Sequence, residues 1–216
     1  MSAEIFELHF DNPEIRKINA IAERLRSGEV MLYPTDTGFT MGCQLGNKTA
    51  IEKLRRIRKL SDRKALTFLC EDLSNISEYA NVTNLAYKAI KRLIPGPYTF
   101  ILPATKLTPR LAMHPTRKTA GIRVPDCNIS KSLINAMGEP IISISARIDM
   151  DDSDDYLYLQ PDEIIEKFYN LVDIVVSSNR YNFKGESTVI DMVSNDFKII
   201  REGANVDKVI ELLDVE

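Results

Sequence analysis

The sequence has 216 residues, of which 44% are hydrophobic and 27% are charged, and its formal net charge is -3. This composition is typical of a folded globular protein and excludes a disordered or fibrous chain. Because no linker-like or repeated segment divides the sequence, we expect one α/β domain over residues 1–216. Any contact with nucleic acid must come from a local basic patch, since the chain as a whole carries no basic field.

The three cysteines and two histidines show neither a CxxC pair nor the spacing of zinc ligands. We therefore predict buried thiols and no metal site formed by the protein. The first residues are acidic, and no apolar run approaches the ~18 residues that cross a membrane. From this we expect a cytoplasmic protein that does not enter a membrane.

Helical and extended patterns alternate along the chain. A first strand at residues 5–10 is followed by a helix that begins at Pro13 and ends at Gly28. The next strand, residues 30–33, turns at Pro34 into a segment of small hydroxyl residues and glycines that we interpret as a loop. The later helices are expected at residues 49–59, 73–79, 85–93, 129–137 and 161–169. The later strands are expected at residues 65–70, 98–104, 119–124, 140–147, 172–178, 185–192 and 196–203, with an acidic loop at residues 149–155.

Hydroxyl and arginine side chains gather at the ends of the predicted strands. They are Thr35, Thr37, Thr99, Thr119, Arg123, Ser143, Ser145, Ser187, Thr188 and Arg201. Arginine forks match phosphate or carboxylate oxygens, so the set suits an anionic ligand. Taken alone, each Thr or Ser is more often a turn or cap residue, and Arg201 could be a charge that protects a sheet edge. Arg123 lies inside a strand and must be paired or face a cavity.

A basic run follows in the helix at residues 49–59 and just beyond it. Its members are Lys53, Arg55, Arg56, Arg58, Lys59, Arg63 and Lys64. These side chains could contact the phosphates of a nucleic acid, although a charge-rich helix is usually a solvated face with some salt bridges.

Five sequence blocks, spread over about 170 residues, occur in an order that resembles the YrdC-like family, the threonylcarbamoyl-AMP synthase superfamily. The blocks are YPTDTGFTMGC, PGPYTFIL, TAGIRVPD, GESTVID and IIREG. The resemblance implies an open, twisted, mixed α/β sheet with helices and a large positively lined cavity. It also implies a link to the synthesis of threonylcarbamoyl-AMP from L-threonine, bicarbonate and ATP, which serves threonylcarbamoyl-adenosine formation on tRNA.

The resemblance assigns roles to residues of this chain by position. The threonine or carbamoyl end would be held by Thr35, Arg58, Lys64, Arg123 and Ser187, with Thr99 as a secondary candidate. The nucleotide, ATP or an AMP-like molecule with magnesium on its phosphates, would be held by Thr119, Ser143, Ser145, Arg147 and Arg201. The basic run, and not the resemblance, suggests that Arg55, Arg56 and Lys59 would contact RNA, either tRNA or double-stranded RNA.

The sequence departs from the synthase pattern at two places. Arg58-Lys59-Leu60 stands where synthases carry KxR, and Ser145-Ala146-Arg147 stands where they carry SxN. Lysine and arginine prefer different ligand geometries, and an amide differs from a cation, so both changes affect the expected binding centre. The departures resemble the YciO branch and favour a protein that binds nucleotide and RNA. Two alternatives stay open, an active threonylcarbamoyl-AMP synthase and a hydrolase that removes threonylcarbamoyl from tRNA.

Overall fold

The computed structural model describes residues 2–60, 65–149, 156–157 and 160–214. Its helices are α1 (Ile15–Arg26), α2 (Lys48–Ile57), α3 (Leu73–Tyr79), α4 (Asn84–Leu93), α5 (Asn128–Met137), α6 (Pro161–Phe168) and α7 (Val206–Asp214). Its strands are β1 (Glu4–Leu8), β2 (Met31–Thr35), β3 (Gly38–Gln44), β4 (Thr67–Leu69), β5 (Tyr98–Pro103), β6 (Thr119–Arg123), β7 (Ile141–Ser145), β8 (Ile148–Asp149), β9 (Tyr156–Leu157), β10 (Ile174–Ser178), β11 (Thr188–Asp191) and β12 (Lys198–Arg201). No described helix is long and apolar enough to cross a membrane.

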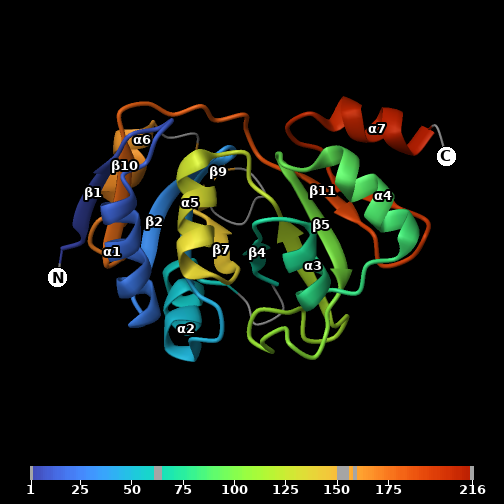
Figure 1. Ribbon diagram of the computed structural model, residues 1–216, viewed down its shortest axis with the longest axis horizontal. Coiled ribbons are helices and arrows are strands. Elements are labelled where there is room, and N and C mark those ends of the chain that lie inside the picture. Colours follow the sequence, from blue (N-terminus) through green and yellow to red (C-terminus); the bar gives the residue numbers. More distant parts are fainter. Residues whose placement is uncertain (1, 61–64, 150–155, 158–159, 215–216) are drawn as a thin grey trace.

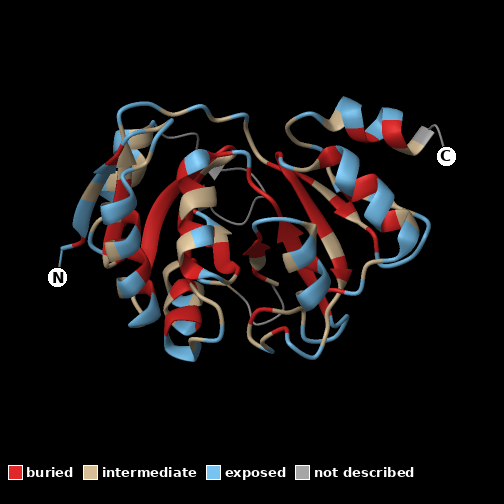
Figure 2. Ribbon diagram, in the orientation of Figure 1, coloured by how far each residue is buried: buried red, intermediate tan, exposed pale blue. Residues whose placement is uncertain are grey.

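Ten of these strands form one open mixed sheet in the order β1-β10-β2-β3-β7-β4-β6-β5-β11-β12, and β8 pairs with β9 apart from it. The sheet contains parallel pairs, such as β4 with β6 and β5 with β11, and antiparallel ones, such as β3 with β7. Helices α1 and α5 pack side by side, and α4 lies beside α7 near the C-terminal end (Figure 1). The central strands are the most deeply buried part of the fold (Figure 2).

Local signals in the sequence explain where several helices begin. The side chains of Asn47, Asp72 and Thr83 each accept a hydrogen bond from a backbone N–H in the first turn of the helix that follows, which replaces a bond the helix cannot make internally. Gly138 ends α5 in the left-handed conformation that glycine adopts without a side-chain clash. The predicted α3 has the observed bounds, and α2, α4, α5 and α6 differ from prediction by one or two residues at an end.

Strand β3, the short pair β8–β9 and helix α7 differ from the prediction. Residues 38–44, interpreted as a loop, form β3, because Phe39, Met41 and Cys43 alternate into the core while the residues between them are small. Helix α7 was not predicted. It is a short amphipathic helix whose buried residues, Val209 and Leu212, join the core. Lys64 and most of the acidic loop at 149–155 lie outside the described residues.

Candidate functional site

A cavity of about 530 Å³ lies over the middle of the sheet. Its floor follows one cross-strand row, Ser143 on β7, Thr67 on β4, Gly121 on β6 and Ile101 on β5, which are neighbours in register. Three of these four residues are glycine or carry a hydroxyl, so the row leaves space above the sheet and lines it with donors and acceptors. The volume is within the ~300–1,000 Å³ of small-molecule and cofactor sites.

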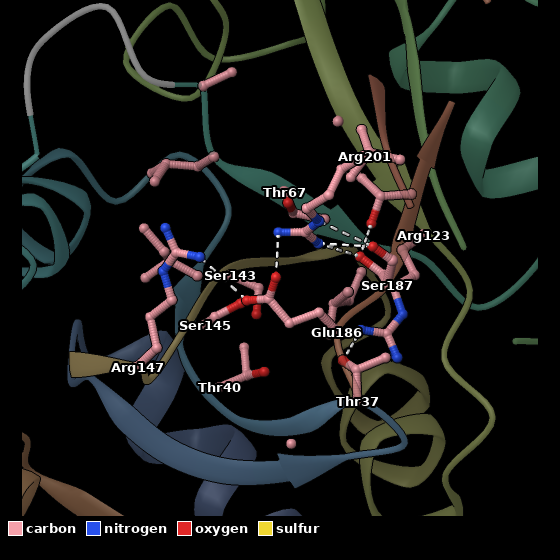
Figure 3. A pocket seen from close by; sticks show the side chains of 18 of the residues that line it. Thr37, Thr40, Thr67, Arg123, Ser143, Ser145, Arg147, Glu186, Ser187 and Arg201 are labelled. Atoms are coloured by element: carbon pink, nitrogen blue, oxygen red, sulfur yellow. Dashed lines mark hydrogen bonds and ion pairs between the residues drawn. The ribbon is translucent and has the colours of Figure 1, made fainter. Parts of the chain in front are cut away.

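Positive charge dominates the described lining of this cavity. It contains five arginines, Arg58, Arg117, Arg123, Arg147 and Arg201, and one carboxylate, Glu186. Figure 3 shows several of these side chains reaching into the same space from β6, β12 and the segments after β7 and before β11. An excess of guanidinium groups in a partly enclosed site favours a phosphate or carboxylate ligand.

Arg123 reaches the pocket from the end of β6 and is itself almost completely buried. Its guanidinium donates to the Asp36 carboxylate and to the Thr37 hydroxyl. Burial lowers the pKa of Arg123, and the Asp36 charge opposes that change. The β2–β3 turn therefore fixes the position of this cation, and the second carboxylate oxygen of Asp36 has no hydrogen-bond partner among the described residues.

A second cluster joins β5, β11 and β12. The hydroxyls of Thr99 and Ser187 lie 2.9 Å apart, and Arg201 donates to the Ser187 carbonyl at 2.8 Å and to the Ser187 hydroxyl at 3.0 Å. These contacts hold Arg201 at the pocket wall although it belongs to the outermost strand. They also orient the Ser187 hydroxyl toward the Thr99 side of the site.

Glu186 lies between two pocket arginines (Figure 3). One carboxylate oxygen is 3.2 Å from Nη1 of Arg147, and the other is 3.0 Å from Nη1 of Arg201. Arg58 in turn donates from Nη1 to the Arg147 carbonyl at 2.6 Å. The two positions at which the sequence departs from the synthase pattern are thus in direct contact.

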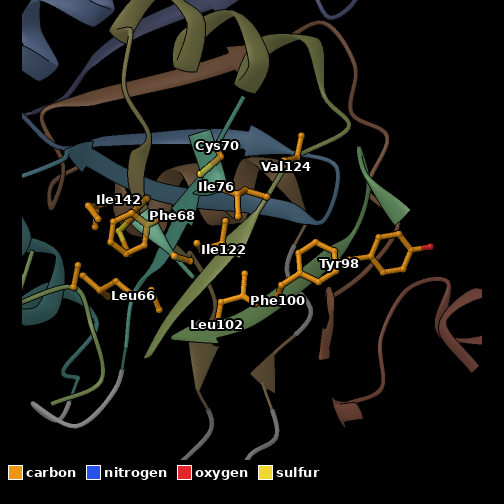
Figure 4. Close-up of a cluster of buried hydrophobic side chains, with 14 of the residues drawn as sticks. Leu66, Phe68, Cys70, Ile76, Tyr98, Phe100, Leu102, Ile122, Val124 and Ile142 are labelled. Atoms are coloured by element: carbon orange, nitrogen blue, oxygen red, sulfur yellow. The ribbon is translucent and has the colours of Figure 1, made fainter. Parts of the chain in front are cut away.

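The back of the floor is supported by a packed core. Alternate residues of the same strands, Phe68, Ile122, Phe100 and Ile142, point away from the pocket and cluster with Ile76 of α3 (Figure 4). The period-two alternation of a strand explains why one face can be apolar and the other polar. The pocket floor is therefore rigid by packing and not only by hydrogen bonds.

Aromatic side chains form an apolar edge to the site. Phe39 and Phe183 line the cavity, and Tyr181 contacts both of them, with ring centroids 5.1 and 5.3 Å away. Such an edge can cover the apolar face of a ligand, for example a nucleobase. Deeper in the sheet, burial raises the pKa of Tyr33, whose hydroxyl lies 3.0 Å from that of Ser143, so this phenol stays protonated.

Most of the residues predicted for small-molecule binding come together in the cavity. The lining includes Arg58, Thr99, Thr119, Arg123, Ser143, Ser145, Arg147, Ser187 and Arg201. Thr35 does not belong to the lining. Its hydroxyl donates to the Gly38 carbonyl at 2.8 Å inside the turn, and Thr37 takes the place at the wall. Lys64 lies outside the described residues.

The three residues predicted to contact RNA have different surroundings. Arg55 is partly buried and donates to the Leu111 carbonyl at 2.8 Å, whereas Arg56 and Lys59 are exposed. Sequence reasoning missed Asp36 and Glu186, and it also missed Arg117, His114 and Thr67 of the lining. Asp36 could have been found, since it lies between two candidate threonines, but nothing in the sequence marks Glu186 as a partner of two arginines.

A magnesium ion, which the resemblance implies, would need carboxylate or phosphate oxygens. Within the described ranges, no group of three or more His, Cys, Asp or Glu side chains is placed to hold a metal ion. Glu186, the carboxylate of the described lining, is already engaged by two arginines. These residues do not fit a magnesium site, and an ion would have to arrive on the phosphates of a ligand.

The chain is thus an α/β protein with an arginine-lined pocket over an open mixed sheet. The Sua5/YciO/YrdC family model, described as telomere recombination, matches residues 23–203. The chain is 38% identical over 201 residues to the Escherichia coli protein YciO, described as uncharacterized, and the match covers 93% of this chain and 96% of YciO. A threonylcarbamoyl-AMP synthase of Vibrio vulnificus is 30% identical over 137 residues, 62% of this chain and 73% of the synthase.

Solved structures agree with these matches. The crystal structure of E. coli YciO superposes with a TM-score of 0.85 at 38% identity, covering 94% of this chain and 98% of that one. P. abyssi Sua5 complexed with L-threonine gives a TM-score of 0.84 at 24% identity, covering 96% of this chain and 61% of that one, which shows a shared fold. The chain belongs to the Sua5/YciO/YrdC family. The predicted family and its open mixed α/β sheet are thereby confirmed.

Proposed function

We propose that the protein binds RNA, either tRNA or double-stranded RNA, and that one nucleotide of this RNA enters the arginine-lined pocket. The observation that carries the proposal is the combination of five arginines, a floor of hydroxyl and glycine residues and an aromatic edge in one cavity. Guanidinium groups suit phosphate oxygens, hydroxyls suit sugar and base edges, and aromatic rings suit a base. The relation to threonylcarbamoyl-AMP synthases supports an adenosine nucleotide and a threonyl group as the ligand class.

A basic rim beside the pocket supports an RNA partner. The bond from Arg55 to the Leu111 carbonyl places the end of α2 against the loop between β5 and β6. We define the basic rim as the exposed cations of these two segments that do not line the cavity, Arg56, Lys59, Lys106, Arg110 and Lys118. Arg117 and His114 of the same loop line the cavity, so the rim leads to its mouth. Recognition of one nucleotide within RNA requires a surface that binds the phosphates of the RNA backbone and, next to it, a pocket large enough for a base.

The altered motif positions favour binding over threonylcarbamoyl-AMP synthesis. Arg147 replaces a neutral amide, its carbonyl accepts a bond from Arg58, and its guanidinium pairs with Glu186. The two motifs thus keep two cations, because Leu60 stands where KxR has its second one and Arg147 adds one elsewhere, so the charge facing the reacting groups is differently placed than in the synthase pattern. The described lining also offers hydroxyls and guanidiniums but no cysteine or lysine nucleophile, so its chemistry is positioning and charge stabilisation.

Two measurements on the pure protein test the proposal. The first is pyrophosphate release with ATP, magnesium, L-threonine and bicarbonate, with each substrate omitted in turn, and we expect none. Release that needs both L-threonine and bicarbonate would establish a synthase. The second is the threonylcarbamoyl-adenosine content of tRNA after incubation with the protein, because its loss would establish a hydrolase.

The basic rim is tested by RNA affinity as a function of salt. The Arg56→Ala, Lys59→Ala double variant should lower the slope of log affinity against log salt by roughly 1.4 to 1.8, because two phosphate contacts are lost. The control is Lys88→Ala, Lys91→Ala on α4, which removes the same charge from exposed positions away from the rim. An unchanged slope in the first variant, or an equal loss in both, would refute the rim as the RNA surface.

A further inference from the structure

The position of Glu186 suggests a role in choosing the ligand by its charge. Its carboxylate is the acidic group in the described lining, and it contacts Arg147 at 3.2 Å and Arg201 at 3.0 Å. The side chains of Glu186 and Arg147 are each 20% exposed, so the contact lies inside the pocket and is less screened by salt than a surface pair. Any ligand phosphate that approaches these two arginines meets the same carboxylate.

The backbone of Glu186 and Ser187 is held by the segment at residues 201–204. Its carbonyl accepts a hydrogen bond from the Ala204 amide at 2.7 Å, and the next carbonyl, that of Ser187, accepts from Arg201. A Cβ atom at Gly203 would lie 2.4 Å from the Glu186 carbonyl oxygen, so the two segments are as close as a glycine allows. The carboxylate can therefore rotate, but the segment that carries it cannot withdraw from the pocket without breaking these contacts.

We propose that Glu186 is a specificity-determining residue that admits a ligand with one phosphate group and disfavours a polyphosphate. Two arginines that share one carboxylate retain a net charge that suits the single phosphate of a nucleotide within RNA. Each further negative charge on the ligand is repelled by the carboxylate. For a like charge held several ångströms away in a partly exposed site, this repulsion lowers the affinity about tenfold. The inference rests on the proposed function in taking a nucleotide as the ligand.

Isothermal titration of the Glu186→Gln variant tests the proposal with four probes at low salt, adenosine, AMP, ATP and inorganic tripolyphosphate. We expect ATP and tripolyphosphate to bind to Glu186→Gln at least tenfold more tightly than to the unaltered protein. The affinity of AMP should rise less, and that of adenosine should change by no more than about twofold. The matched control is Glu202→Gln, which makes the same charge change at an exposed neighbouring position outside the pocket and should alter none of the four. Glu186→Asp keeps the charge and should keep the preference for the lower-charged ligand.

The result that overturns the inference is a Glu186→Gln variant whose affinities change by the same factor for every probe or do not change at all. Failure of both the unaltered protein and the variant to bind tripolyphosphate, ATP and AMP would overturn it too. If Glu186→Gln does not fold, the inference is overturned by a Glu186→Asp variant that has lost the preference for the lower-charged ligand. A charge-dependent gain in Glu186→Gln together with no affinity for tRNA would refute the proposed RNA function and leave the charge selection standing.

Discussion

Alanine at Gly42 and alanine at Gly121 should have opposite effects, although both glycines lie in one cross-strand row of the sheet. A Cβ atom at Gly42 would lie 2.8 Å from Cε1 of Tyr33 and 2.9 Å from Cγ2 of Ile141, both on fully buried side chains. A Cβ at Gly121 would lie 3.5 Å from the nearest atoms of Thr67 and Thr99, which is ordinary contact. The first substitution overpacks the core, and the second adds a methyl group to the pocket floor.

The magnitudes follow from these distances. Overpacking should lower the free energy of unfolding of Gly42→Ala by about 1 to 3 kcal/mol. Gly121→Ala should raise it by about 0.4 to 1 kcal/mol, because alanine restricts the unfolded chain and suits an ordinary strand conformation. For a chain of this size each kcal/mol shifts Tm by about 2 to 4 °C. Thermal denaturation with circular dichroism measures both variants.

Ligand binding separates the two variants further. The methyl group of Gly121→Ala enters the space that a nucleotide would occupy, so its AMP affinity should fall although its stability rises. Titration calorimetry measures this. A Gly121→Ala variant as unstable as Gly42→Ala would refute the reasoning about the floor, and unaltered AMP affinity would show that the ligand does not reach Gly121.

Three further predictions concern a buried ion pair, the cysteines and a close backbone contact. Asp36→Ala should lower the free energy of unfolding in urea by about 3 to 5 kcal/mol, because it leaves the Arg123 charge buried without its partner; unaltered stability would contradict the pairing. Burial raises the pKa of Cys43 to about 12, so at pH 8 this thiol stays protonated, and the three buried cysteines should react with a thiol reagent only after unfolding. Gly203→Ala should lower Tm by several degrees, since its Cβ would collide with the backbone at 186–187, and an unchanged Tm would show that this segment can move.

The sequence predicted the pocket best where one strand carries the signal. In TAGIR, alternation alone places Thr119, Gly121 and Arg123 on one face, and the structure has all three in the lining. Arg123 was also expected to be paired or to face a cavity, and it does both. Strand alternation is local, so it can be derived without knowing which strands are neighbours.

Features that depend on strand order could not be predicted in this way. Glu186 meets Arg147 and Arg201 because β7, β11 and β12 are brought around one cavity, and no local pattern encodes that arrangement. Thr35 and Thr37 have strand spacing, yet the chain turns between them, so only Thr37 faces Arg123. The small residues of β3 have a weak strand propensity, so the sequence did not indicate a strand there. Pairing with β2 and β7 stabilises the strand despite that propensity.

The edge position of β12 connects the pocket to amide hydrogen exchange, which is expected to be faster in an edge strand than in the central strands. Among the described strands, β12 pairs only with β11, the register between them shifts near Val189, and Ile200 is 56% exposed, so β12 should open locally before the central strands do. Opening would carry Arg201 out of the cavity and release Glu186. An anion bound to Arg201 would therefore stabilise the pairing of β12 at the edge of the sheet. The amide hydrogens of β12 would then exchange more slowly with the ligand bound than without it.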